Sequence, residues 1–225
     1  MPMDGVMLGF VARQLDTVLR DGRVDRVIQP EKDEIHLMIR AQGVNHRLVL
    51  SAAASAARVH LSEHAKTGPM EPPMFCMLLR KHLVGARVLS IEQPDLERMV
   101  ILTLQCTDEF GEISQKQLVL ECMGRRSNLV LLDAQGRIVE CLRRVDADLS
   151  ATRQLLPGLF YHEPPRQDRR IPQETTEAGL LALLDRPDAA MRLDKWLLAH
   201  FAGLSPLIAR ELSFRFAGET DAPIP

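Results

Sequence analysis

The chain has 225 residues, a formal net charge of −2 and the composition of an ordinary globular protein, with 46% hydrophobic and 26% charged residues. This balance excludes a chain that binds nucleic acid through overall charge, and it confines any such site to a local patch. The four cysteines include no Cys-x-x-Cys pair, which argues against a zinc ribbon and favours buried free thiols in a reducing compartment. No secretory pattern and no run of about 18 apolar residues is present, so we expect a cytoplasmic protein without a membrane span.

The N-terminal part of the chain predicts one helix followed by a run of short strands. Apolar side chains recur at helical spacing over residues 4–21, and Gly22 follows as a helix end. Apolar and polar residues then alternate as in strands, and the link at residues 42–45 predicts a hairpin between the second and third of them. The expected strands are Val24–Gln29, Glu34–Arg40, His46–Leu50 and Arg58–Leu61.

Residues 72–83 predict a helix that interrupts the strands. Pro72 and Pro73 suit its start, because the first N–H groups of a helix have no partner within it. We expect a buried apolar stripe on one side and cations at the C-terminal end, where the helix dipole favours positive charge. The stripe is expected to contain Met74, Met77 and Leu78, with Phe75 and Leu79 as further candidates, and the cations are Arg80, Lys81 and His82.

A second run of strands follows this helix. Turn sequences at residues 108–111 and 133–136 join several of them, so neighbouring strands are expected to be antiparallel. Few helices lie between strands, which argues against a doubly wound parallel sheet. The expected strands are Arg87–Gln93, Arg98–Gln105, Lys116–Glu121, Asn128–Leu132 and Ile138–Leu142.

The pattern changes near residue 157, where prolines and polar residues predict a linker. Helices are then expected at Glu177–Leu184, Ala189–Phe201 and Pro206–Phe216. Ser205 is placed to cap the last of these, with Pro206 at its first position, which is typical of a helix–hairpin–helix. We therefore predict an α+β domain with a mostly antiparallel sheet over residues 1–170, a small all-α domain over 171–218 and a tail over 219–225.

A series of motifs, in order along essentially the whole chain, resembles the N-terminal part of the RqcH/NEMF family. These are the NFACT-domain proteins, whose bacterial members have long been called fibronectin-binding proteins. The motifs are Asp4-Gly5, Glu71–Leu83, Ile91-Glu92-Gln93, Glu121–Asn128, Leu156-Pro157-Gly158, Pro164-Pro165 and Gly203–Glu211. The resemblance implies a sheet domain similar to the N-terminal fold of formamidopyrimidine-type DNA glycosylases. The family's coiled coil and C-terminal RNA-binding domain do not follow, so we expect this sequence to be a fragment.

The resemblance also implies a function in ribosome-associated quality control. Such a factor binds tRNA, alanine tRNA in bacteria, and the large (50S) ribosomal subunit that carries a stalled peptidyl-tRNA and its nascent chain. It promotes untemplated alanine tailing, alongside a small S4-like RNA-binding partner. The ribosome performs the chemistry, so the resemblance implies no enzyme, no cofactor and no metal in this chain.

Two groups of positions match the family's tRNA-recruiting motifs, the pair Glu97-Arg98 and the triplet Glu121-Cys122-Met123. Glu97 stands where the family usually has Asp, which puts its own role in doubt. The adjoining loop has two arginines, a hydroxyl and an amide, which suit a phosphate backbone. The loop residues are Arg125, Arg126, Ser127 and Asn128, and further phosphate contacts are expected at Arg80, Lys81, Gly203 and Ser205.

Other interpretations of these residues remain open. Glu97 and Arg98 could form an exposed ion pair of little energetic value, and the arginine loop could be a solvated turn. A DNA glycosylase would use an N-terminal proline amine, here Pro2, but Met3 follows where those enzymes have glutamate. A surface adhesin would need an export signal or an anchor. His60 and His64 have the spacing of a helical metal pair, but they lie in a strand-like region without a third ligand.

Overall fold

The computed structural model describes residues 3–108, 110–166, 168–184 and 191–224. The chain divides into two compact units. The first contains Met7–Pro94 and Arg98–Pro164, together with the N-terminal end at Met3. The second contains Asp4–Val6, Asp95–Glu97 and the chain from Pro165 onward. Pro2, the nucleophile of the glycosylase interpretation, lies outside the described residues, as do the first two residues of the helix predicted from Ala189.

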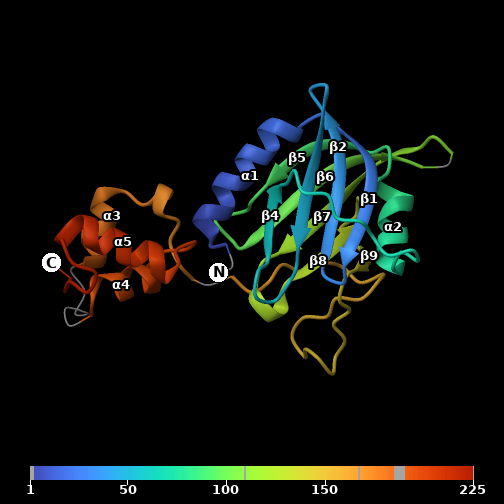
Figure 1. The fold of residues 1–225 in the computed structure, drawn as a ribbon. Coiled ribbons are helices and arrows are strands. Elements are labelled where there is room, and N and C mark those ends of the chain that lie inside the picture. The colour runs from blue at the N-terminus through green and yellow to red at the C-terminus, as the bar shows by residue number, and fades with distance from the viewer. Residues whose placement is uncertain (1–2, 109, 167, 185–190, 225) are drawn as a thin grey trace. The chain divides into compact units, whose positions relative to one another are not determined.

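The first unit contains a nine-stranded sheet within the described residues, and every pair of neighbouring strands is antiparallel (Figure 1). This confirms the expected antiparallel sheet. The strand order is β4-β3-β2-β1-β5-β6-β7-β8-β9, so each half of the sheet is a meander. The bounds are β1 Arg23–Glu31, β2 Glu34–Ala41, β3 Val44–Ser51, β4 Arg58–Leu61, β5 Arg87–Glu92, β6 Met99–Thr107, β7 Ile113–Glu121, β8 Asn128–Leu132 and β9 Ile138–Cys141.

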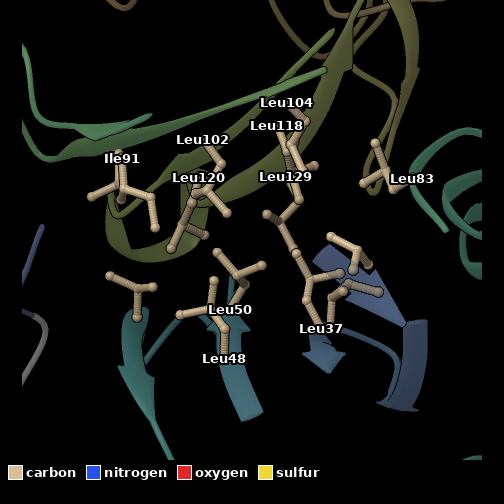
Figure 2. Packing of buried hydrophobic residues seen from close by; sticks show 14 of the residues in the cluster. Leu37, Leu48, Leu50, Leu83, Ile91, Leu102, Leu104, Leu118, Leu120 and Leu129 are labelled. Atoms are coloured by element: carbon tan, nitrogen blue, oxygen red, sulfur yellow. The ribbon is translucent and has the colours of Figure 1, made fainter. Parts of the chain in front are cut away.

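The two halves of the sheet face each other across the main core. They are joined within the sheet only where β1 pairs with β5, through Arg23 and Arg87, among the described residues. Figure 2 shows Leu37 and Leu48 of the first half pointing toward leucines of the second half, such as Leu120. Full burial of such a side chain contributes about 1.5–3 kcal/mol. The curled sheet therefore closes on itself through apolar packing rather than through strand pairing.

Two helices complete this core. Helix α1 spans Gly5–Leu19 and buries Leu8, Leu15 and Leu19. Helix α2 spans Met74–Leu83 and begins directly after Pro73, as predicted. In Figure 1 the two helices lie at opposite sides of the sheet.

The predicted buried stripe of α2 was correct for Phe75 and Leu79, with Leu78 partly buried against the core, but it was wrong for Met74 and Met77. Met74 is 76% exposed and Met77 is 49% exposed. The buried residues are Phe75, Cys76, Leu79 and Leu83. Met74 and Met77 also fit a helical spacing, so periodicity alone could not exclude them from the buried side. The choice is made by packing on β1, where Arg80 Nε donates to the carbonyl of Val27 at 2.9 Å.

The outer face of β6–β9 is also buried, because the segment that follows β9 folds back over it. A second apolar cluster there joins Met99, Val119 and Val130 to Leu155 of that segment, with Tyr161 packed against it. Backbone hydrogen bonds between Val145 and Leu155 hold the segment together. Burial on both faces explains why all five residues of β8 are inaccessible. This segment also supplies the side chains that surround the candidate site.

The second unit contains helices α3 Glu177–Leu184, α4 Leu193–His200 and α5 Pro206–Ala217. Its core is built around Trp196, which contacts the ring of Phe201 edge-on. Ser205 caps α5 by accepting from the Ile208 N–H at 3.3 Å, and Pro206 occupies the first turn, as predicted. None of the helices in the described part of the chain has the length and hydropathy needed to cross a membrane.

The four cysteines are buried free thiols, as predicted. Burial raises the pKa of each of them, to about 12 for Cys122 and Cys141. Because the thiolate is the reactive form, we expect native protein at about pH 8 to react with a thiol reagent far more slowly than protein unfolded in guanidinium. Rapid modification of one thiol in the native protein would contradict this burial.

Candidate nucleic-acid interface

The candidate site lies at one end of β6, β7 and β8, which run side by side (Figure 1). Arg98 immediately precedes β6, and Glu121 ends β7 in register with Met99. The Cys122 N–H donates to the Arg98 carbonyl at 2.7 Å, which extends the pairing past both strands. The structure therefore brings Arg98 next to the segment from Cys122 to Asn128. Antiparallel pairing is the reason, because the start of one strand meets the end of its neighbour.

The segment between β7 and β8 is a short, internally bonded turn. Gly124 has a φ of +60°, a conformation that favours glycine, and it begins a single turn of 3-10 helix, Gly124–Arg126. The Ser127 hydroxyl accepts from the Met123 N–H at 2.9 Å, and the Arg126 N–H donates to the Met123 carbonyl at 3.1 Å. We call residues 123–127 the arginine turn. Its hydrogen bonds hold the backbone while the side chains of Arg125 and Arg126 project into solvent.

Three guanidinium groups are thus exposed at this end of the sheet. Arg98, Arg125 and Arg126 are all exposed, and their side chains make no hydrogen bond or ion pair to any residue that the structure describes. A planar guanidinium with several N–H donors can bind a phosphate oxygen pair directly. The arrangement suits an anionic partner with repeated phosphates, and it is local, as the net charge of −2 requires.

Glu121 lies beneath this surface in a buried network. Its side chain is fully inaccessible and forms an ion pair with Arg153, whose side chain is 15% exposed. The two terminal guanidinium nitrogens, Nη1 and Nη2, donate to the carboxylate, and the Tyr161 hydroxyl donates to it at 2.7 Å. Burial opposes the charge on Arg153, but the hydrogen bond and the charge of Glu121 raise its pKa. Burial also raises the pKa of Tyr161, so its hydroxyl remains a donor.

Several predicted site residues are therefore not available to a partner. Glu121, Cys122, Ser127 and Asn128 are all buried. These buried residues support the arginine turn. Of the residues predicted at positions 121–128, only the exposed arginines and the half-buried Met123 are accessible for direct contact with a nucleic acid. Arg153 and Tyr161 were missed by the sequence analysis. Both belong to an irregular segment, where no periodicity indicates which side chain turns inward.

Glu97 and Arg98 are consecutive in the chain but belong to different units. Glu97 lies in the second unit with Asp95 and Leu96, whose φ values of +44° and +57° are unusual for residues other than glycine. Asp95 forms an ion pair with Arg166 of the same unit. Glu97 and Arg98, which the sequence analysis treated as one binding motif, therefore lie where the chain passes from the second unit to the first.

The residues predicted to make further phosphate contacts are spread over both units. Arg80 is half-buried and already bonded to Val27, whereas Lys81 is exposed at the end of α2. In the second unit, Ser205 is engaged as the cap of α5, and the Gly203 carbonyl accepts from the Val6 N–H at 3.1 Å. Arg80 and Lys81 thus belong to the same unit as the arginine turn, whereas Gly203 and Ser205 belong to the other unit.

Residues 4–224 match the family model described as NFACT N-terminal and middle domains. The chain belongs to the NFACT family. It is 39% identical over 216 residues to the Rqc2 homolog RqcH of Bacillus subtilis, which covers 96% of this chain and 38% of that protein. It is 38% identical over 88 residues to ribosome quality control complex subunit 2 of Saccharomyces cerevisiae, covering 39% of this chain and 8% of that protein.

Solved NFACT structures share the fold. The N-terminal domain of the fibronectin-binding protein PavA from Streptococcus pneumoniae superposes with a TM-score of 0.89 and 33% identity, covering 96% of this chain and 80% of that chain. This agreement confirms the predicted family. The chain spans 38% of the length of the curated Bacillus relative.

Proposed function

We propose that this NFACT chain is the tRNA-binding part of a ribosome quality control factor. In this proposal it presents alanine tRNA to a large ribosomal subunit that holds a stalled peptidyl-tRNA, and it promotes alanine tailing of the nascent chain. The names of the Bacillus and yeast relatives support the ribosome quality control context. The proposal also keeps the predicted helix–hairpin–helix at α4 and α5 as a backbone-binding element.

The observation that carries the proposal is the set of exposed arginines at one end of the sheet. Arg98, Arg125 and Arg126 project from two adjoining backbone segments that hydrogen bonds hold together. The backbone that carries them is held in place, and each planar guanidinium presents several donors in a geometry that matches a phosphate group. They are also independent of base sequence, so the choice of a particular tRNA would need additional contacts.

The proposal assigns the chemistry to the ribosome rather than to this chain. Cys122 directly precedes the arginine turn, and burial raises the pKa of its thiol to about 12. A thiol in that state is almost wholly protonated at neutral pH and does not attack an ester or an amide. A recruiting role is therefore more consistent with the site than covalent catalysis.

Replacing Arg98 with alanine tests this function. If Arg98 contacts a phosphate, Arg98→Ala should weaken tRNA binding and reduce the dependence of log K on log salt by about 0.7–0.9. Because Arg98 is exposed, the free energy of unfolding should change by only about 0.5 kcal/mol. Fluorescence anisotropy with labelled tRNA over a range of salt concentrations measures the first effect, and thermal melting measures the second.

Arg26→Ala is the matched control, because Arg26 is an exposed arginine on β1 in the other half of the sheet. It removes the same charge and should leave both affinity and salt dependence close to wild type. Equal weakening by the two variants would show only a general effect of charge. Unfolding of Arg98→Ala would show that Arg98 is structural.

Fibronectin binding is a second candidate function, because the structurally similar PavA is named as a fibronectin-binding protein. A surface assay with purified fibronectin, using wild type and Arg98→Ala, separates the two functions. Loss of tRNA binding with unchanged fibronectin binding would assign them to different surfaces. The similarity to DNA glycosylases stays a prediction.

A further inference from the structure

The side chain of Arg143 contacts residues of three separate segments of the chain. It lies just after β9, and its side chain is 36% exposed. Its Nη1 donates to the carbonyls of both Ala52 and Ser127, at 2.9 Å to Ala52. Its Nη2 lies 3.4 Å from the Asp33 carboxylate. The guanidinium therefore contacts two backbone carbonyls and one carboxylate, which belong to three separate segments of the chain.

The backbone of Arg143 is held as firmly as its side chain. Its N–H donates to the Asn128 side-chain oxygen at 3.0 Å, and its carbonyl accepts from the Asn128 amide nitrogen at 2.7 Å. Asn128 is buried and begins β8, directly after the arginine turn. This reciprocal pair fixes where the Arg143 side chain starts, and so fixes which carbonyls it can reach.

The three acceptors of Arg143 come from both halves of the curled sheet. Asp33 lies between β1 and β2, and Ala52 follows β3, so both belong to the first half. Ser127 ends the arginine turn in the second half. The Ala52 N–H also donates to the Asp33 carbonyl at 2.8 Å, so the two acceptors from the first half are tied to each other. Arg143 thus connects the two halves of the sheet at a place away from β1 and β5, the strands through which the halves pair.

The bridge sets the position of the arginine turn. A Cβ atom built on Gly124 would lie 3.8 Å from the Ala54 carbonyl oxygen, so the start of the turn lies near the segment after β3. The Ser127 carbonyl, at the other end of the turn, is held by Arg143. Arg143 therefore ties the Ser127 end of the turn to the first half of the sheet, and Arg125 and Arg126 directly precede this end.

We propose that Arg143 is a positioning residue for RNA binding, which holds the arginine turn so that Arg125 and Arg126 meet the phosphate backbone together. This inference rests on the proposed tRNA-binding function. The bridge requires a planar guanidinium, since lysine has one donor group on a flexible stem and cannot reach two carbonyls and a carboxylate at once. Arg143 acts through the turn rather than through its own contact with RNA.

The test compares Arg143→Ala, Arg143→Lys and the control Arg144→Ala. Arg144 is the next residue and is also in an ion pair, with Glu140 at 2.7 Å, but it does not touch the turn. Hydrogen exchange should be about tenfold faster at the bonded amides of the turn in Arg143→Ala and unchanged there in Arg144→Ala. Arg143→Lys should be intermediate, and it keeps the test valid if the alanine variant does not fold. Unchanged exchange in the turn of Arg143→Lys and Arg143→Ala would overturn the proposal.

The functional step is tested by combining Arg143→Ala with Arg126→Ala and measuring the affinity for tRNA. If Arg143 acts through the turn, each single change should weaken binding about five- to tenfold, and the double variant should be little weaker than either. Multiplying effects would show that Arg143 contacts RNA by itself, which would contradict a positioning role. A loosened turn with unchanged affinity would also overturn it. If wild type does not bind tRNA, the proposed function fails, and with it the link to RNA, while hydrogen exchange still decides whether Arg143 positions the turn.

Discussion

Replacing Glu121 with alanine is expected to lower the free energy of unfolding of the sheet unit by about 3–5 kcal/mol. The Glu121 carboxylate is fully inaccessible and neutralises Arg153, which is itself mostly buried. Without it, the mostly buried Arg153 keeps its charge with only the His162 carbonyl as a hydrogen-bond acceptor among the described residues, and the Tyr161 hydroxyl loses its acceptor. Removal of one partner of a buried pair costs more than the pair itself contributes. Denaturant unfolding followed by circular dichroism measures the loss.

A double replacement separates this structural role from direct tRNA contact. Glu121→Leu combined with Arg153→Met removes both charges at similar volume and should recover part of the lost stability, because well-packed apolar groups often replace a buried ion pair without cost. The Tyr161 hydroxyl still lacks its acceptor in this variant, so recovery should be incomplete. If Glu121 acts only on the structure, the double variant should also recover tRNA binding. A Glu121→Ala variant that melts like wild type but does not bind tRNA would instead support the direct contact that the family resemblance implies.

Replacing Gly5 with alanine is expected to be strongly destabilising, although alanine usually favours a helix by about 1 kcal/mol over glycine. A Cβ atom at Gly5 would lie 2.0 Å from the Leu96 carbonyl oxygen and 2.6 Å from the Gly203 Cα, all within the second unit. Both neighbours are backbone atoms and cannot rotate away. We expect a lower melting temperature and rapid exchange of the Val6 amide, which is bonded to the Gly203 carbonyl in the native protein.

Gly179→Ala is the control for this change, because Gly179 lies in the first turn of α3 in the same unit. A Cβ atom there would lie 3.3 Å from the Thr176 hydroxyl oxygen, which a small side-chain adjustment can relieve. Its effect on the melting temperature should be small. Comparable losses in the two variants would show that the backbone approach at Gly5 is not the cause.

Much of the secondary structure followed from local patterns. Local patterns of apolar and turn residues predicted each strand of the sheet with ends off by a few residues at most, and the Ser205 cap with Pro206 located the start of α5. These features depend on residues close together in the chain. In α2 the predicted stripe wrongly included Met74 and Met77, because they are as apolar as the buried Phe75 and Leu79, and only the surface against which the helix packs distinguishes them.

The sequence by itself determined the antiparallel strands, the capped helices, the NFACT resemblance and the residue types of the arginine turn, since each of these depends on the identity and spacing of residues that are close together in the chain. Only the tertiary structure decided which of these residues reach solvent. Glu121 looks like a surface residue in the sequence, yet Arg153 and Tyr161, from a segment without periodicity, enclose it. Arg143 and Arg144 are consecutive residues of the same type, and the sequence does not show which of them bridges the sheet. The hydrogen bonds between the Arg143 backbone and the Asn128 side chain direct Arg143 toward Ala52 in the other half. Long-range contacts of this kind depend on how the curled sheet closes, and the closure of the sheet cannot be predicted from local sequence patterns.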